Sequence, residues 1–295
     1  EGAFEYDRYA LCSDRTKKKI LKADVDIEIN IENYDWVILI GSEALKYYTK
    51  MNSITEYSGR CIEDKYLPVI NPAMLAFKPE ALPLWEESKN NIIKYISGKL
   101  KVERLGTDKC YGITEKEKLI KFLIDAIKHD NDYVAVDTET TGLYPRDGYV
   151  LGISVSYEKD HGAYIDTSII TEQEEKLFQE LFDKKTVVFH NAKFDLAMLE
   201  YHFGFKFPHF EDTMLLHYCL EEQPGTHGLK QLAMKFTPYG DYEQPMHDWI
   251  DGYRKANRIL KANFSWDAIP FDVMKVYASM DAVVTQLVFA KLYPA

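Results

Sequence analysis

Closely spaced cysteines are missing from this 295-residue chain. Its cysteines, Cys12, Cys61, Cys110 and Cys219, lie far apart and form none of the close pairs used by metal-binding or redox motifs. The eight histidines show no zinc-like spacing with them either. We therefore expect free thiols in a reducing compartment rather than a disulfide framework or a zinc site.

Long apolar runs, a signal peptide and internal repeats are also lacking. No hydrophobic stretch approaches the length of a membrane span, and Glu1 does not begin a secretory signal. These features predict a cytoplasmic, monomeric protein that does not associate with membranes. With 46% hydrophobic residues, the chain is able to bury one large core or two modest ones.

A positive excess of charge is missing as well, because the formal net charge is −11. A protein that holds duplex DNA by its phosphates is usually basic. The acidic total argues against such a surface here. It does not argue against a site that receives a single frayed strand end, and part of the charge lies in three acidic segments of the C-terminal half.

Each of these segments lies beside a core-forming run. Asp137 and Glu139 end one apolar run, Asp195 follows a second, and Tyr277 and Asp281 are four apart, on one face of a predicted helix. Buried acids cost free energy unless they are paired or bind a metal. Convergence of the three segments would give an oxygen-only site, which favours Mg²⁺ or Mn²⁺.

Each segment alone has a plain alternative, since a strand that ends in two solvated acids is common. Their order along the chain is more specific. Over residues 105–295 the chain resembles the DEDDy 3′→5′ exonucleases, whose three motifs carry, in this order, Asp and Glu, then Asp, then Tyr and Asp. All five family positions hold the expected residue types.

The resemblance implies phosphodiester hydrolysis with two divalent cations about 3.5–4 Å apart. Asp137 would bridge both cations, and Glu139 and Asp281 would complete the site of the cation that acidifies water. Asp195 would hold the second cation through water. Tyr277, helped by Glu139, would orient the attacking water; with a pKa of about 10, a phenol is a poor base at neutral pH.

The surrounding sequence predicts an α/β domain, which the resemblance makes ribonuclease-H-like. Strands are expected at 133–137, 149–157, 163–166 and 187–189. In the second strand apolar and small residues alternate, as in a sheet with one buried side. Capping boxes at 114–117 and 171–174 predict helix starts, and Pro270 with Asp272 opens the helix of Tyr277.

Three further stretches, 210–216, 227–233 and 281–285, resemble the proofreading domain of family A DNA polymerases more than ribonuclease D. The resemblance places the following residues near the substrate: Thr138, Leu143, Asn191 and Phe194. Leu143 would wedge against the terminal base, or be an ordinary strand-end core leucine. Phe194 has the alternative of plain helix core.

Two polar residues in these stretches have open alternatives. Lys230 is either a contact to the DNA backbone or a solvated lysine. Asp212 is interpreted as a helix N-cap or a core hydrogen-bond acceptor rather than as a fifth metal ligand.

Residues 1–104 are predicted to form a small α/β domain of their own, with strands at 36–40 and 66–70, an amphipathic helix at 79–97 and a linker at 99–113. The arrangement resembles the C-terminal half of the uracil-DNA glycosylase fold, with Asn71-Pro72-Ala73 in place of a His-Pro-Ser-like motif. It implies an inactive glycosylase remnant and a bacteriophage source. The basic run 15–19 is either a DNA contact or a solvated helix end or loop.

Three functions follow from these observations. The first is a proofreading exonuclease that acts on single-stranded DNA or a frayed primer 3′ end, in the host cytoplasm, for a polymerase domain absent from this chain. The second is a ribonuclease D-like RNA-trimming enzyme. The third is a non-catalytic module that binds single strands, although the complete carboxylate set argues against it.

Overall fold

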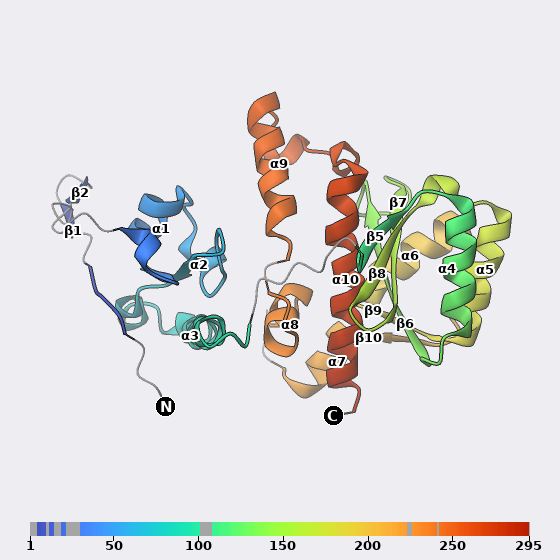
Figure 1. Ribbon diagram of the computed structural model, residues 1–295, viewed down its shortest axis with the longest axis horizontal. Helices are drawn as coiled ribbons and strands as arrows, with labels where there is room; N and C mark the ends of the chain where they lie inside the picture. Colours follow the sequence, from blue (N-terminus) through green and yellow to red (C-terminus); the bar gives the residue numbers. More distant parts are fainter. Residues whose placement is uncertain are drawn as a thin grey trace. The chain divides into compact units, whose positions relative to one another are not determined.

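The chain divides into two compact units, Glu1–Val102 and Glu103–Ala295, which are described separately (Figure 1). This computed structural model describes residues 5–9, 12–14, 19–21, 30–100, 108–222, 226–240 and 242–294. The predicted domain boundary after residue 104, most of the basic run at 15–19 and much of the predicted linker lie outside these residues.

The first unit is built on two pairs of short strands. β1 (Cys12–Asp14) and β2 (Lys19–Leu21) are antiparallel, whereas β3 (Val37–Ile40) and β4 (Tyr66–Val69) are parallel. A parallel pair needs a crossover connection, and α1 (Ser42–Thr49) and α2 (Ile54–Tyr57) supply it. The predicted strands are confirmed, and Gly41 forms the turn into α1 with a φ of +86°.

The helix predicted at 79–97 forms in two parts. A 3-10 turn, Pro79–Ala81, precedes α3 (Leu82–Ile96), and Gly98 follows with a φ of +67°. The Asn-Pro segment after β4 has a local structural role, because the Asn71 side chain accepts a hydrogen bond of 3.0 Å from the Ala73 N–H. The resemblance of this unit to a glycosylase stays a prediction.

The second unit contains a six-stranded mixed sheet in the order β10-β9-β6-β7-β8-β5. Its strands are β5 (Cys110–Ile113), β6 (Tyr133–Thr140), β7 (Val150–Glu158), β8 (His161–Asp166), β9 (Thr186–Phe189) and β10 (Phe210–Asp212). β7 pairs antiparallel with β6 and β8, while the β9–β6, β10–β9 and β5–β8 pairs are parallel.

Two predictions near the start of this unit were wrong. Residues 110–113 belong to the sheet rather than to a linker, and Cys110 and Ile113 are buried there. The capping box at 114–117 does not form, because Glu115 is the N-cap of the first helix and makes no side-chain cap hydrogen bond. The box at 171–174 does form: the Thr171 N–H donates to Glu174 Oε2 at 2.9 Å.

Helices cover both faces of the sheet (Figure 1). The helices of this unit are α4 (Lys116–Lys128), α5 (Glu172–Lys184), α6 (Ala192–Phe203), α7 (Thr213–Leu220), α8 (Leu229–Phe236), α9 (Gln244–Asn257) and α10 (Phe271–Leu292), of which α8 and α9 pack on α10. One core joins α4, α5 and α6 to residues of β6 such as Val134 and Val136. Ala135, which points to the opposite face, packs with Phe289 of α10.

β7 is buried on both faces, so the prediction of a strand with one buried side was wrong. Ile153 and Val155 face the α4–α6 core, and Ser154 and Ser156 are equally buried on the other side. There the Ser156 hydroxyl donates to Gln286 Oε1 of α10 at 3.2 Å. The small residues of β7 therefore make room for α10 rather than mark a solvated face.

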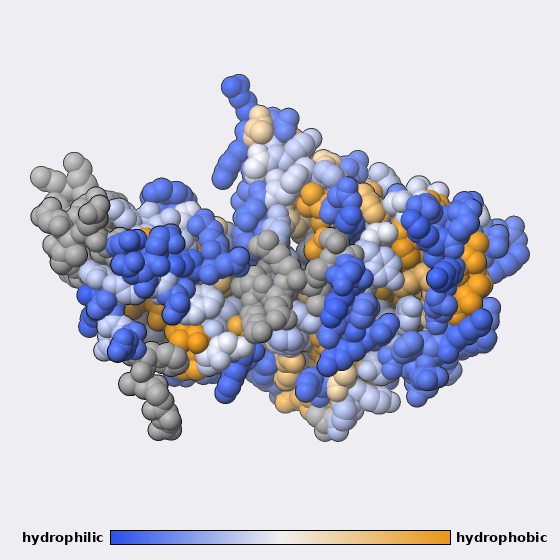
Figure 2. All heavy atoms as spheres, in the orientation of Figure 1, coloured by the Kyte–Doolittle hydropathy of each residue, from blue (hydrophilic) through white to orange (hydrophobic). Residues whose placement is uncertain are grey.

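α10 is long and apolar enough to cross a membrane by length and composition, which the sequence did not lead us to expect. In this fold it is a core helix: 67% of its most apolar window is buried, and it packs on β5, β6, β7 and β8. Figure 2 shows polar side chains over much of the visible surface of the second unit, with apolar side chains in smaller patches between them.

Candidate active site

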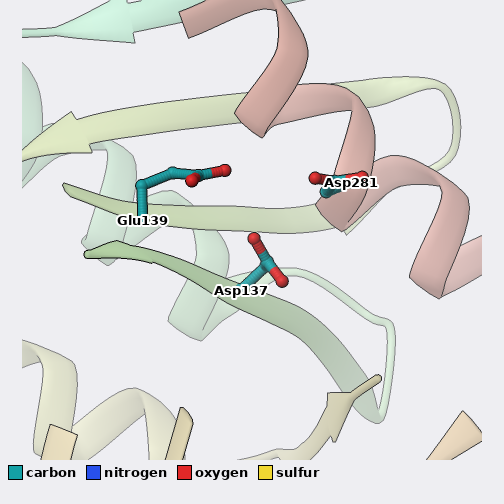
Figure 3. A group of neighbouring side chains, drawn as sticks. All are labelled: Asp137, Glu139 and Asp281. Atoms are coloured by element: carbon teal, nitrogen blue, oxygen red, sulfur yellow. The ribbon is translucent and has the colours of Figure 1, made fainter. Parts of the chain in front are cut away.

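Three carboxylates meet where α10 crosses the face of β6. Asp137 and Glu139 are two residues apart on the strand and therefore point to the same face of the sheet. In the pairing of β6 with β7, Asp137 lies beside Ser154 and Glu139 beside Gly152. Asp281 approaches from α10. One side-chain oxygen of each acid lies within 4.8 Å of the others, and Figure 3 shows the three carboxylate groups directed at one another.

Burial and mutual repulsion make this cluster electrostatically costly. Burial, followed by the charges of Asp195, Asp281 and Glu139, raises the pKa of Asp137 well above its ordinary value. Burial and the charge of Asp281 do the same to the pKa of Glu139. A hard divalent cation would remove this cost, and a donor set made only of carboxylate oxygens suits such a cation. Three of the four predicted carboxylates therefore form an acidic cluster, and its occupation by a metal stays a prediction.

Asp195 lies outside this group of three. It is 3% exposed in the first turn of α6, and its Oδ1 accepts from the N–H and the hydroxyl of Thr138, at 3.0 and 2.7 Å. Burial raises its pKa to about 7, although the hydrogen bonds from Thr138 act in the opposite direction. Thr138, predicted to contact substrate, thus has its hydroxyl engaged with a predicted site carboxylate.

Tyr277 lies one turn before Asp281 on α10, so both side chains project toward the same cluster. Burial, followed by the charges of Asp281, Glu139 and Asp137, raises the pKa of the Tyr277 hydroxyl well above 10. The hydroxyl therefore remains protonated at neutral pH. A protonated hydroxyl is able to donate a hydrogen bond, and the role of Tyr277 in orienting water stays a prediction.

Two residues that the sequence did not assign to this site complete it. The ammonium of Lys230, on α8, binds Asp281 Oδ1, so the residue is not a freely solvated lysine. The hydroxyl of Tyr242 donates to the same oxygen and accepts from Lys230 Nζ at 2.7 Å. Lys230 was considered as a DNA contact or a solvated lysine, and Tyr242 belongs to a short segment without a motif or a periodic pattern.

The residues predicted to lie near the substrate differ in their exposure. Leu143 is 77% exposed in the loop between β6 and β7, so the alternative of a strand-end core leucine was wrong. Asn191 has a φ of +65° at the start of α6 and is exposed. Phe194 is half-buried and packs against the α4–α6 core, which is the alternative considered for it.

Asp212 holds two helix starts together. It caps α7 by accepting from the Met214 N–H at 2.9 Å, and it also accepts from the N–H groups of Asn191 and Ala192 at 3.0 and 2.9 Å. The interpretation of Asp212 as a helix cap and hydrogen-bond acceptor is confirmed. Through these bonds it fixes the turn from which α6 presents Asp195.

The sequence profile of the 3'-5' exonuclease family of DNA polymerase A matches residues 111–295. The chain belongs to this family. It is 38% identical over 301 residues to the DNA polymerase of Escherichia phage T5, which covers 95% of this chain and 35% of that protein. The DNA polymerase of Bacillus phage SP01 is 24% identical, over 90% of this chain and 32% of its own length.

The chain therefore spans about a third of the length of these two relatives. Among solved structures it is similar to Escherichia coli RNase D, with 18% identity, a TM-score of 0.47, and coverage of 62% of this chain and 44% of the other. The family membership confirms the exonuclease class predicted from the three motifs. With the observed mixed sheet, it also confirms the ribonuclease-H-like α/β fold.

Proposed function

We propose that this chain removes nucleotides from DNA 3′ ends and proofreads for a family A DNA polymerase. One observation carries the proposal: Asp137, Glu139 and Asp281 converge within 4.8 Å in a chain of the 3'-5' exonuclease family. The phage relatives are DNA polymerases about three times as long as this chain. A polymerase domain is accordingly its proposed partner, and a bacteriophage in a host cytoplasm its proposed setting.

Divalent cations, Mg²⁺ or Mn²⁺, are the proposed cofactors. Asp137, Glu139 and Asp281 would hold them, and Asp195 would contribute from the neighbouring helix start. Bound cations would acidify a water molecule and neutralise charge on the scissile phosphate and the leaving 3′-oxygen. The residues themselves fit this task, because they supply several hard oxygen donors in a buried site.

Within that site Tyr277 acts by position. Its hydroxyl keeps its proton, so it is able to donate to a water or to a phosphate oxygen but not to abstract a proton. Glu139 lies on the facing strand and offers carboxylate oxygens that accept from the same water. The pair would orient the water for attack in line with the leaving group.

The loop between β6 and β7 is the proposed contact to the terminal base. Its ends are tied by the Thr141 N–H, which donates to the Tyr149 carbonyl at 3.0 Å, and a Cβ on Gly148 would lie 2.5 Å from the Gly142 nitrogen. This closed loop presents Leu143, 77% exposed, and Tyr144, 67% exposed. Apolar and aromatic side chains of this kind stack against unpaired bases without regard to sequence.

The first test uses 5′-labelled single-stranded DNA with Mg²⁺ or Mn²⁺, together with an RNA of the same sequence. The proposal requires a ladder that shortens from the 3′ end of the DNA and disappears in EDTA. Asp137→Ala should lower the rate by about 10³-fold, because it removes a central cation ligand. Asp183→Ala, which removes an exposed acid on the outer face of α5, is the matched control.

The other outcomes separate the remaining functions. A preference for RNA would indicate a ribonuclease D-like trimming enzyme, because the 2′-hydroxyl distinguishes the two substrates. Metal-dependent binding of single strands without any cleavage would indicate a binding module. Activity of Asp137→Ala close to that of the wild type would contradict the proposed site.

A further inference from the structure

The carboxylate cluster already holds a positive charge supplied by the protein. Lys230 Nζ bonds to Asp281 Oδ1, and its charge also acts on Asp137 and Glu139, where it opposes the rise in pKa that burial causes. One ammonium thus faces three converging acids.

The surroundings of this ammonium have the composition of a cation site. Lys230 Nζ lies 4.2 Å from the ring centroid of Tyr242 and 4.5 Å from that of Tyr277, both within the range of a cation–π interaction. The Tyr242 hydroxyl accepts from Nζ at 2.7 Å. Two aromatic faces, a hydroxyl and a carboxylate therefore surround one charge, unlike the environment of an incidental surface ion pair.

The hydrogen bonds at Asp281 set up a conflict with a bound metal. Its Oδ1 accepts from both Lys230 and Tyr242, which occupies the lone pairs of that oxygen. A divalent cation among the three carboxylates would also repel an ammonium that touches one of them. Either the ammonium or the cation is able to neutralise the cluster, and simultaneous occupation is unfavourable.

We propose that Lys230 is the resident counter-ion of the metal-free site and that a divalent cation displaces it from Asp281. The site then has two states, one with the ammonium on Asp281 and one with the metal on the carboxylates. Lys230 is 26% exposed, so rotation of its side chain is sufficient for release and no helix has to move. Tyr242, buried and neutral, keeps its hydrogen bond to Asp281 in both states.

Competition of this kind has a thermodynamic signature that a merely structural lysine does not share. Removing Lys230 should destabilise the metal-free protein, because buried acids lose their counter-ion. The same change should tighten metal binding, because no bound ammonium has to leave first. By thermodynamic linkage, the unfolding free energy that the variant loses without metal equals its gain in metal-binding free energy. In saturating metal the variant should therefore be as stable as the wild type.

The test measures Mn²⁺ alone, without DNA, by titration calorimetry and by thermal unfolding in EDTA and at saturating Mn²⁺. Lys230→Met should bind Mn²⁺ about tenfold more tightly or better, and should gain more thermal stability from the metal than the wild type. Lys230→Arg keeps the charge and should remain within a few-fold of the wild type. Asp137→Ala should bind Mn²⁺ weakly in every background.

Two control variants separate displacement from simpler effects. Lys235→Met removes the same charge from the same helix, but this lysine is paired with Glu221 and should leave the Mn²⁺ affinity unchanged. Tyr242→Phe removes the other hydrogen bond to Asp281 Oδ1 without removing a charge, and should not tighten binding. Equal tightening by Lys235→Met would reduce the effect to long-range charge and overturn the proposal.

This inference rests on the proposed metal site, and the two fail in different ways. If neither the wild type nor Lys230→Met binds Mn²⁺, the metal site itself is wrong. If both bind it with the same affinity, or if Lys230→Met loses equal stability with and without metal, the metal site stands and the displacement is wrong. A variant that fails to fold even with Mn²⁺ would likewise contradict the proposal, because the metal should replace the missing charge.

Discussion

The hydroxyl and the backbone N–H of Thr138 both donate to one carboxylate oxygen of Asp195, at 2.7 and 3.0 Å. The two residues are far apart in the sequence, and Thr138 lies between Asp137 and Glu139 on β6. Neighbouring residues of one strand point to opposite faces. Asp137 and Glu139 thus face α10, while Thr138 reaches α6 and fixes Asp195, so β6 connects the separate carboxylate segments.

Replacing Thr138 with valine should weaken this connection without changing the volume of the side chain. A hydrogen bond to a charged acceptor contributes about 1.5–3 kcal/mol, and the remaining N–H bond should limit the loss of unfolding free energy to about 1–2 kcal/mol. The exonuclease rate should fall about tenfold as Asp195 loses its orientation. Urea unfolding and single-turnover kinetics measure the two effects. Thr138→Ser, which keeps the hydroxyl, should resemble the wild type in both.

Tyr277→Phe should be much milder than Asp137→Ala, because it removes one hydrogen bond and no ligand. We expect a loss of about tenfold in rate, or about 1.4 kcal/mol of barrier. Since the pKa of Tyr277 lies well above 10, its hydroxyl does not titrate between pH 7 and 9. The pH–rate profiles of wild type and variant should therefore run parallel over that range. A limb of the profile that vanishes in Tyr277→Phe would instead show that the phenol acts as a base.

His190 should make the fold sensitive to acid. Its Nδ1 contacts the Thr213 hydroxyl at 2.9 Å, and that hydroxyl donates to the Phe189 carbonyl at 3.1 Å, so the imidazole must donate from Nδ1. Its Nε2 is buried, without a hydrogen-bond partner in the described part of the chain. Burial lowers the pKa of His190 to about 4.

The sign of the pH dependence follows from this shift. The folded-state pKa lies below the unfolded value of about 6.5, so the unfolded chain binds the proton first. The contribution to stability is fully present above about pH 6.5 and is lost as the pH falls toward 4, with a total of up to about 3 kcal/mol. Urea midpoints measured in EDTA from pH 7.5 to 4.5 should fall less steeply for His190→Asn than for the wild type. Equal slopes would show that His190 does not contribute.

Gly162→Ala should lower both stability and activity. A Cβ at this position of β8 would lie 2.5 Å from the Ser279 carbonyl oxygen and 2.9 Å from Val283 Cγ2, so α10 would have to move away from the sheet. We expect a cost of about 1–3 kcal/mol and a weakened site, because α10 carries Tyr277 and Asp281. Thermal unfolding and the exonuclease rate together provide the measurement.

Gly252→Ala is the matched control for this change. Gly252 lies inside α9, and an added Cβ would meet no heavy atom within 4 Å. Alanine there should raise the unfolding free energy by about 0.5–1 kcal/mol through helix propensity and leave the rate unchanged. If both glycine variants had the same stability and rate, the close packing of α10 on β8 would not explain why glycine is needed at position 162.

The sequence predicted the parts of this protein that are determined by local patterns. The strand that carries Asp137 and Glu139, the helix of Tyr277 and Asp281, and the cap formed by Asp212 each have a signal within a few residues. It did not predict that Lys230 and Tyr242 join the site, because their positions depend on how α8 and the segment before α9 pack on α10. α8 has an apolar face that includes Leu229, Leu232 and Ala233, but this pattern does not reveal that the helix packs on α10.

The remaining errors concern β5, β7 and the start of α4. The four residues of β5 are too few to show alternation, so a buried edge strand was interpreted as linker. The small residues of β7 were taken as a solvated face, although they are small because α10 lies against them. The box at 114–117 has the right residue types, but the chain enters α4 with Glu115 as N-cap. Tertiary packing therefore explains the error at β7, whereas the local backbone at Glu115 explains the error at α4.

The second unit packs around α10, and α10 also carries two of the site residues, Tyr277 and Asp281. Most of its residues from Ala278 to Val284 are fully buried, and it contacts the strands on one side and α7, α8 and α9 on the other. Two residues of the proposed active site therefore lie on a helix that is buried from solvent in the core of the unit. On heating, the site should keep its arrangement until the whole unit melts, and activity and fold should be lost in a single cooperative step rather than one after the other.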